Sequence, residues 1–78
     1  MFEPCEVDAT FAPDGLPKPL SMVWAGKRLS VIEYGRTWQT DEGLFMLVRV
    51  QDGRGFQLWF SSPIWQARLE NTRPTNFV

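Results

Sequence analysis

The sequence contains no histidine and a single cysteine, Cys5. Without histidine the chain lacks the commonest general base near neutral pH, and it cannot form Ser-His or Cys-His nucleophile pairs. One cysteine can form neither an intramolecular disulfide nor a zinc site. The adjacent carboxylates Asp41 and Glu42 fit a turn before Gly43 better than an acid–base pair. We therefore expect no catalytic residue, no cofactor and no metal, and we interpret the chain as a non-enzyme.

An excess of basic charge and long apolar runs are also missing. The 8 basic and 9 acidic residues give a net charge of −1, whereas phosphate neutralisation supplies most of the affinity of duplex-DNA binders. No apolar segment approaches the roughly 20 residues of a membrane-spanning helix. The N-terminus has neither the basic start nor the apolar run of a signal peptide. Together with the single cysteine, these features lead us to expect a cytoplasmic protein without a membrane contact.

Large aromatic side chains and closely spaced turn signals predict an all-β domain. The 78 residues include 4 Trp, 6 Phe and 1 Tyr and fit one domain over residues 1–78. Short segments of alternating apolar residues are typical of strands when turns separate them. The turn signals are Asp14-Gly15, Ala25-Gly26, Asp41-Glu42-Gly43 and Asp52-Gly53. We expect an ordered core over about residues 5–70, beginning with a strand over 5–12, and a frayed tail over 71–78.

The stretch PLSMVWAGKRLSVIEY, residues 19–34, is interpreted as a hairpin with a two-residue loop, Ala25-Gly26. This register produces one apolar face and one mostly polar face, as a correct register should. It also sets Lys18 opposite Glu33 as a charge pair. The other predicted cross-strand pairs are Leu20–Val31, Met22–Leu29, Trp24–Lys27, Ser21–Ser30 and Val23–Arg28.

A second hairpin is predicted over residues 44–60. Its two apolar faces coincide only if the loop has three residues, 51–53, with Gly53 in the left-handed conformation. The predicted pairs on this face are Val48–Phe56, Met46–Leu58 and Leu44–Phe60. The reverse face then carries Phe45 opposite Trp59, Leu47 opposite Gln57 and Arg49 opposite Gly55, so this hairpin is apolar on both faces near its open end.

Two segments lie outside these hairpins. Residues 35–43 are interpreted as a connection in which Trp38 folds back as a lid on an open end of the core. Residues 62–70 are open between two readings, because Ser62-Pro63 and the spacing of Trp65 and Leu69 fit a short helix. The alternation of Trp65, Ala67 and Leu69 fits a strand equally well.

These patterns predict an antiparallel sheet of five or six strands, curled toward a barrel. The predicted core is Leu20, Met22, Leu29, Val31, Met46, Val48, Phe56 and Leu58. A second apolar patch on the reverse face, formed by Phe45, Leu47 and Trp59, is more than a domain of this size is expected to cover. We therefore expect a non-catalytic protein-interaction module that binds a protein partner or a second copy of itself.

The alternative function is binding of single-stranded nucleic acid. Arginines beside exposed tryptophans bind such strands by charge and by stacking on the bases. The candidate residues for this surface are Arg28, Arg36, Trp38 and Arg49. Residues 54–60, RGFQLWF, also match the first three positions of the aromatic RNA-binding strand motif, but Phe56 and Leu58 fall on the predicted core face.

The order of several short motifs resembles a family of small uncharacterised bacterial domains of unknown function. The motifs are DGLPKPLSMVWAGKRLSV, GRTW, FMLVRVQDGRGFQL and WQARL, and they cover roughly residues 14–70. Similar segments lie at the C-terminus of ImuB-type proteins, the Y-family-polymerase-like components of a bacterial mutagenesis machinery. The resemblance implies a small β-sheet curled toward a barrel, with the last segment a strand and Trp65 inward. For the nucleic-acid alternative it implies a link to DNA-damage tolerance.

Overall fold

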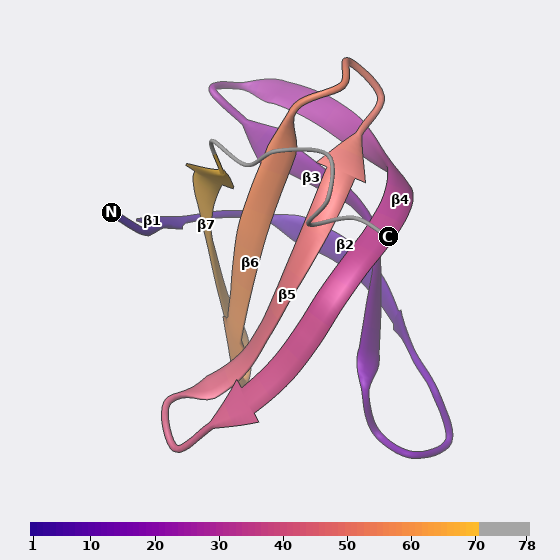
Figure 1. The fold of residues 1–78 in the computed structure, drawn as a ribbon, viewed down its shortest axis with the longest axis vertical. Helices are drawn as coiled ribbons and strands as arrows, with labels where there is room; N and C mark the ends of the chain where they lie inside the picture. Colours follow the sequence, from indigo (N-terminus) through magenta and orange to yellow (C-terminus); the bar gives the residue numbers. More distant parts are fainter. Residues whose placement is uncertain (71–78) are drawn as a thin grey trace.

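Seven antiparallel strands make up the computed structural model, which describes residues 1–70 (Figure 1). The strands are β1 (Glu3–Pro4), β2 (Val7–Phe11), β3 (Pro17–Trp24), β4 (Lys27–Thr40), β5 (Gly43–Val50), β6 (Gly55–Ser61) and β7 (Ile64–Glu70). The order across the sheet is β1-β7-β6-β5-β4-β3-β2. The all-β class is confirmed, with seven strands in place of five or six. Residues 1–70 contain no apolar helix of membrane-spanning length. The predicted frayed tail, residues 71–78, lies outside the described residues.

The sheet curls because the N-terminal segment pairs with both of its ends. β1 pairs with β7, while β2, only two residues further along the chain, pairs with β3. The Cys5 amide donates a hydrogen bond to the Trp65 carbonyl (3.0 Å), and the Val23 amide donates one to the Glu6 carbonyl (2.9 Å). The two edge strands of the sheet, β1 and β2, are therefore consecutive along the chain. Their link draws the two edges together, and the sheet curls around one core. In Figure 1 this segment crosses behind β6 and β7.

The β3–β4 hairpin has the predicted two-residue loop. Ser21, Met22, Val23 and Trp24 lie opposite the four predicted partners, Ser30, Leu29, Arg28 and Lys27. The predicted pair Leu20–Val31 is wrong because β3 contains a bulge: Ala9 lies opposite Pro19 and Asp8 opposite Ser21. Leu20 has no opposite residue in β2 and is 42% exposed, whereas the neighbouring Pro19 is fully buried. A bulge reverses the alternation of side chains, which is why Leu20 is not a core residue.

β4 continues through the segment that was expected to be a connection. Two register shifts interrupt its pairing with β5, one at Ile32 and one between Tyr34 and Thr37. Bulges bend a strand and increase its twist. β4 therefore leaves β3 after Ser30 and continues beside β5 alone, up to Thr40.

Two expectations fail because of this bend. Trp38 is not a lid on the end of the core: it lies within β4, opposite Phe45. The charge pair Lys18–Glu33 does not form, because the Glu33 carboxylate pairs with Arg49 (Nε to Oε1, 2.6 Å). The Lys18 ammonium lies 5.4 Å from the centre of the Tyr34 ring instead.

The β5–β6 hairpin confirms the three-residue loop. Its pairs are Val48–Phe56, Met46–Leu58 and Leu44–Phe60, as predicted. Gly53 has a φ of 92°, and the Val50 amide donates a hydrogen bond to the Arg54 carbonyl (2.9 Å). Residues 64–70 form a strand, β7, which settles the choice that the sequence left open.

The core consists of nine buried residues from five strands: Met22, Leu29, Leu44, Met46, Val48, Val50, Phe56, Leu58 and Ala67. It includes six of the eight predicted core residues. Val31 is partly buried against this core, as is Trp65, which agrees with the inward position that the family resemblance implies. Only Leu20 of the predicted set lies in an exposed position.

The loop of the β3–β4 hairpin permits a prediction about stability. Ala25 has a φ of 51°, a left-handed conformation that asparagine tolerates better than alanine. We expect Ala25→Asn to raise the free energy of unfolding by about 0.5–1 kcal/mol, and Ala25→Val to lower it. Urea denaturation followed by tryptophan fluorescence measures both changes. An Ala25→Asn protein that is no more stable than the original would contradict the prediction.

Candidate functional site

The predicted interaction patch is largely covered by its own aromatic rings. Phe45 stacks between Trp38 and Trp59, with ring centres 5.5 and 5.6 Å apart and planes inclined by 11° and 14°. Phe2 lies against both Phe45 (6.1 Å) and Trp59 (5.3 Å). Phe45 is 8% exposed and Leu47 7%. The expectation that this patch is uncovered is therefore wrong, and Trp59 is its most exposed member.

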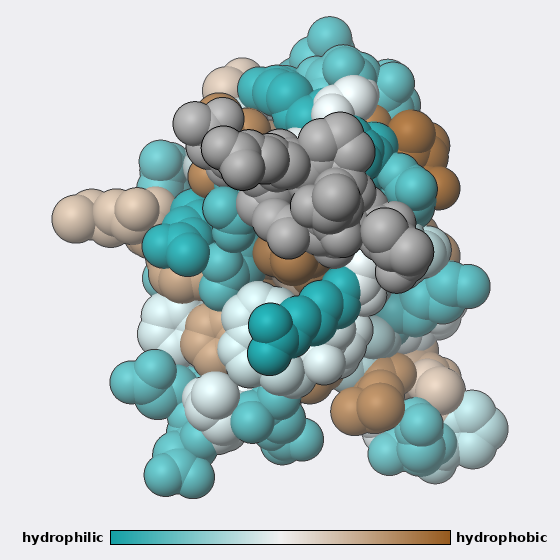
Figure 2. Space-filling view, in the orientation of Figure 1, coloured by the Kyte–Doolittle hydropathy of each residue, from teal (hydrophilic) through white to brown (hydrophobic). Residues whose placement is uncertain are grey.

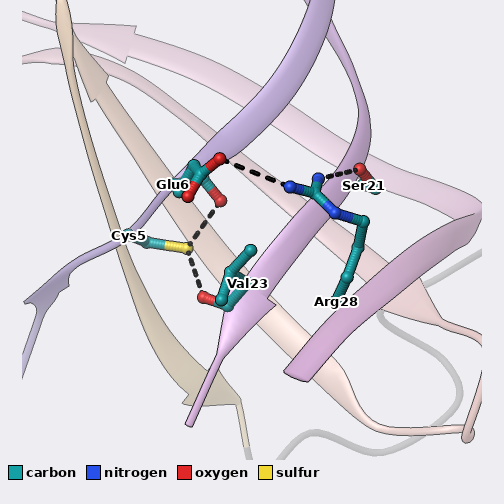
Figure 3. A network of polar contacts seen from close by, with 5 residues as sticks. All are labelled: Cys5, Glu6, Ser21, Val23 and Arg28. Atoms are coloured by element: carbon teal, nitrogen blue, oxygen red, sulfur yellow. Dashed lines mark hydrogen bonds and ion pairs between the residues drawn. The ribbon is translucent and has the colours of Figure 1, made fainter. Parts of the chain in front are cut away.

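The four residues of the nucleic-acid alternative are not brought together. Arg36 lies over the Trp38 ring, 5.1 Å from its centre. Arg49, however, forms an ion pair with Glu33. Arg28 belongs to the β3–β4 hairpin, where it hydrogen-bonds Ser21 Oγ (3.0 Å) and forms an ion pair with the Glu6 carboxylate (3.3 Å), as Figure 3 shows. Two of the three guanidinium groups thus pair with carboxylates, which offset their charge.

Cys5 has a structural role at the junction of β1 and β2. Its thiol lies 3.3 Å from the Val23 carbonyl oxygen and donates a hydrogen bond to it (Figure 3). Burial raises the pKa of the Cys5 thiol, and the neighbouring Glu6 charge raises it further. A reactive cysteine needs the opposite, a lowered pKa. The thiol therefore links the N-terminal segment to β3, and its raised pKa disfavours the thiolate form.

A groove opens where β4 separates from the β2–β3 hairpin. Two adjoining cavities of about 270 and 240 Å³ share Leu16, Pro17 and Leu44 in their linings. We call their union the split groove, and its main apolar residues are Leu16, Pro17, Tyr34, Leu44, Met46 and Phe60. Figure 1 shows the β2–β3 loop and the β4–β5 turn projecting apart at the lower end of the molecule, and Figure 2 shows a notch in the surface between them.

The walls of the split groove are held by hydrogen bonds. On the hairpin side, the Leu16 amide donates to Asp14 Oδ1 (2.9 Å), and the Leu16 carbonyl accepts from the Ala12 amide (3.0 Å). Across the groove, the Tyr34 hydroxyl donates to the Pro19 carbonyl (2.7 Å) and links β4 to β3. Burial raises the pKa of the Tyr34 phenol, which favours the protonated donor. The apolar side chain of Leu16 is nevertheless 46% exposed at the rim.

An acidic turn borders the larger cavity. Asp41 and Glu42 lie in the turn between β4 and β5, and both are exposed. The Glu42 amide donates to Thr40 Oγ1 (3.0 Å), and its carbonyl accepts from Trp59 Nε1 (2.8 Å). Ion pairs among residues 1–70 use other carboxylates, those of Glu6, Glu33 and Asp52, so the two acidic side chains of the turn have no basic partner in this part of the chain.

The split groove was not identified from the sequence, although one signal pointed to it. Pro17 and Pro19 flank Lys18 in β3, and proline has no amide hydrogen to donate to a neighbouring strand. The spacing indicated an extended or edge conformation, and β3 indeed has no pairing with β4 over this stretch. The bulges at Leu20 and Ile32, which open the groove, have no comparable signal in the sequence.

The split groove has the composition of a binding site. The smaller cavity is lined mainly by apolar residues, whereas the lining of the larger one also includes polar residues, among them Gln39, Ser61 and Ser62. An exposed leucine lies at the rim and charged residues lie at the edges, as in sites that recognise a few side chains. Asp41 and Glu42 border one cavity, and Lys18 borders the other. No protein-family model, curated protein or solved structure matches the chain.

Proposed function

We propose that the protein is a non-catalytic interaction module that binds an extended segment of a partner protein in the split groove. One observation carries the proposal: β3 and β4 stop pairing after Ser21–Ser30, and the space between them is an apolar groove. Removing apolar surface from water favours association of two chains. The aromatic patch on the reverse face supports this function less well, because the rings of Phe2, Trp38 and Trp59 already cover Phe45. Its member Leu47 lines the smaller cavity of the split groove.

An extended segment suits the shape of the split groove. Alternate side chains of an extended peptide point the same way, about 6.5–7 Å apart, and enter successive pockets. The two adjoining cavities share Leu16, Pro17 and Leu44, so two such side chains would lie side by side on one apolar floor. Leu16, exposed at the rim, would be covered by the bound segment.

Replacement of Leu16 by aspartate tests the proposal. Peptides selected from a random library for binding to the original protein should bind Leu16→Asp at least about 10-fold more weakly, since the change places a charge against the apolar segment. Ile64→Asp is the matched control, because Ile64 is exposed to a similar degree (55% against 46%) and lies outside the split groove. Fluorescence anisotropy with labelled peptides measures the affinities.

Two results would overturn the proposed function. One is a selection that yields no peptide with saturable binding. The other is a set of peptides whose affinities fall equally with Leu16→Asp and Ile64→Asp, or with neither. Circular dichroism of both variants shows whether they remain folded, which is expected because each substitution lies on the surface.

A further inference from the structure

We infer that the segment bound in the split groove carries a lysine or arginine beside its apolar anchor, an inference that rests on the proposed function. The larger cavity is bordered by Asp41 and Glu42, and these are the charged residues in its lining. Both side chains are exposed, and neither has a basic partner within residues 1–70. A cation bound with the segment would meet two carboxylates at this end of the groove.

The carboxylates are presented from a fixed turn. Trp59 of β6 donates its indole N–H to the Glu42 carbonyl, and Thr40 accepts from the Glu42 amide. The next residue, Gly43, packs so closely on β6 that an added Cβ would lie 2.5 Å from the Phe60 carbonyl oxygen. The backbone that carries the two charges therefore has little freedom, and a partner cation encounters them without first having to order the turn.

The charges also disfavour other occupants. An acidic segment, or the phosphates of a nucleic acid, would be repelled by Asp41 and Glu42. Lys18 borders the smaller cavity, but its ammonium lies over the Tyr34 ring at the far side from the turn. The basic residue of the partner is accordingly placed at the β4–β5 turn, and the apolar anchor lies over Leu44 and Phe60.

Three variants of one peptide from the selection described above test the inference. They carry the same apolar anchor and differ at the adjacent position, which is lysine, uncharged norleucine or glutamate. We expect the lysine peptide to bind about 2- to 10-fold more tightly than the norleucine peptide, and the glutamate peptide to bind most weakly. The preference should shrink between about 50 and about 200 mM salt, because screening weakens exposed charge pairs. It should vanish in the double variant Asp41→Asn/Glu42→Gln, which keeps the size of both side chains.

The outcomes separate the inference from the function on which it rests. Equal affinities for the lysine and norleucine peptides overturn the inference and leave the proposed function intact. A lysine preference that persists in Asp41→Asn/Glu42→Gln also overturns it, since the cation would then be recognised elsewhere. If neither the lysine nor the norleucine peptide binds the original protein, the proposed function fails and the inference fails with it.

Discussion

Replacing Phe56 by alanine is expected to lower the free energy of unfolding by about 3–5 kcal/mol. Phe56 is fully buried, and it lies in β6 between Val48 of β5 and Leu69 of β7. Its ring meets the edge of Trp24 at 5.0 Å between ring centres, which ties the β3–β4 hairpin to the opposite side of the sheet. Truncation removes the buried area and leaves a cavity that a small, curled sheet has little means to collapse.

The size of this loss matters because the domain is small. A chain of 78 residues has a total stability of about 4–12 kcal/mol. The Phe56→Ala protein should therefore retain only part of its stability and, toward the lower end of that range, be mostly unfolded at 25 °C. Urea titration with circular dichroism measures the change without depending on Trp24, whose fluorescence the substitution also alters.

Phe11→Ala is the matched control for Phe56→Ala. The substitution is identical, but Phe11 is 59% exposed, at the end of β2, and it contacts Phe60 with ring centres 6.0 Å apart. We expect a loss of about 1 kcal/mol or less. Similar losses in the two variants would mean that Phe56 does not hold the core together as its burial indicates.

The parts of this fold that were predictable are those governed by local alternation. Val48 and Phe56 share a face only with a three-residue loop, so the register of β5 and β6 follows from the side chains themselves. The same holds for Met22 and Leu29 across a two-residue loop. In each case a wrong register would expose an apolar face, and the sequence therefore contains enough information to reject it.

The parts that were not predictable depend on bulges. At Leu20 and Ile32 one strand has an extra residue, and the alternation on either side changes face. Nothing about a leucine or an isoleucine marks a bulge, because the position is set by how far the strand must bend to close the sheet. The split groove results from these bends, and this is why the sequence pointed to the patch around Phe45 instead.

The stacking of Trp38, Phe45 and Trp59 has a similar explanation. The sequence placed Phe45 opposite Trp59 correctly. It did not place Trp38 beside them, because the second bulge of β4 brings Trp38 into that row. A cross-strand row of rings covers itself, so apolar residues on the second face of a hairpin do not by themselves indicate a site for a partner.

Replacing Gly43 by alanine is expected to lower the free energy of unfolding by about 2–4 kcal/mol, from backbone strain and from overpacking together. Gly43 has a φ of 135°, a conformation that side chains with a Cβ rarely adopt. The added Cβ would also lie 2.5 Å from the Phe60 carbonyl oxygen and 2.9 Å from Trp59 Nε1. The backbone of β6 cannot move away without breaking its pairing with β5, so both costs remain in the folded protein.

Gly15→Ala separates the two costs. Gly15 also has a positive φ, 86°, but no atom lies within 4 Å of an added Cβ. Strain alone should cost about 1–2 kcal/mol there, so the difference between the variants measures the contact with β6.

In a Gly43→Ala protein that remains folded, the turn must shift away from Trp59, and Asp41 and Glu42 shift with it. Such a protein should lose the preference for a lysine peptide while still binding the norleucine peptide. A Gly43→Ala protein as stable as Gly15→Ala, with the lysine preference unchanged, would mean that β6 does not hold the acidic turn in place.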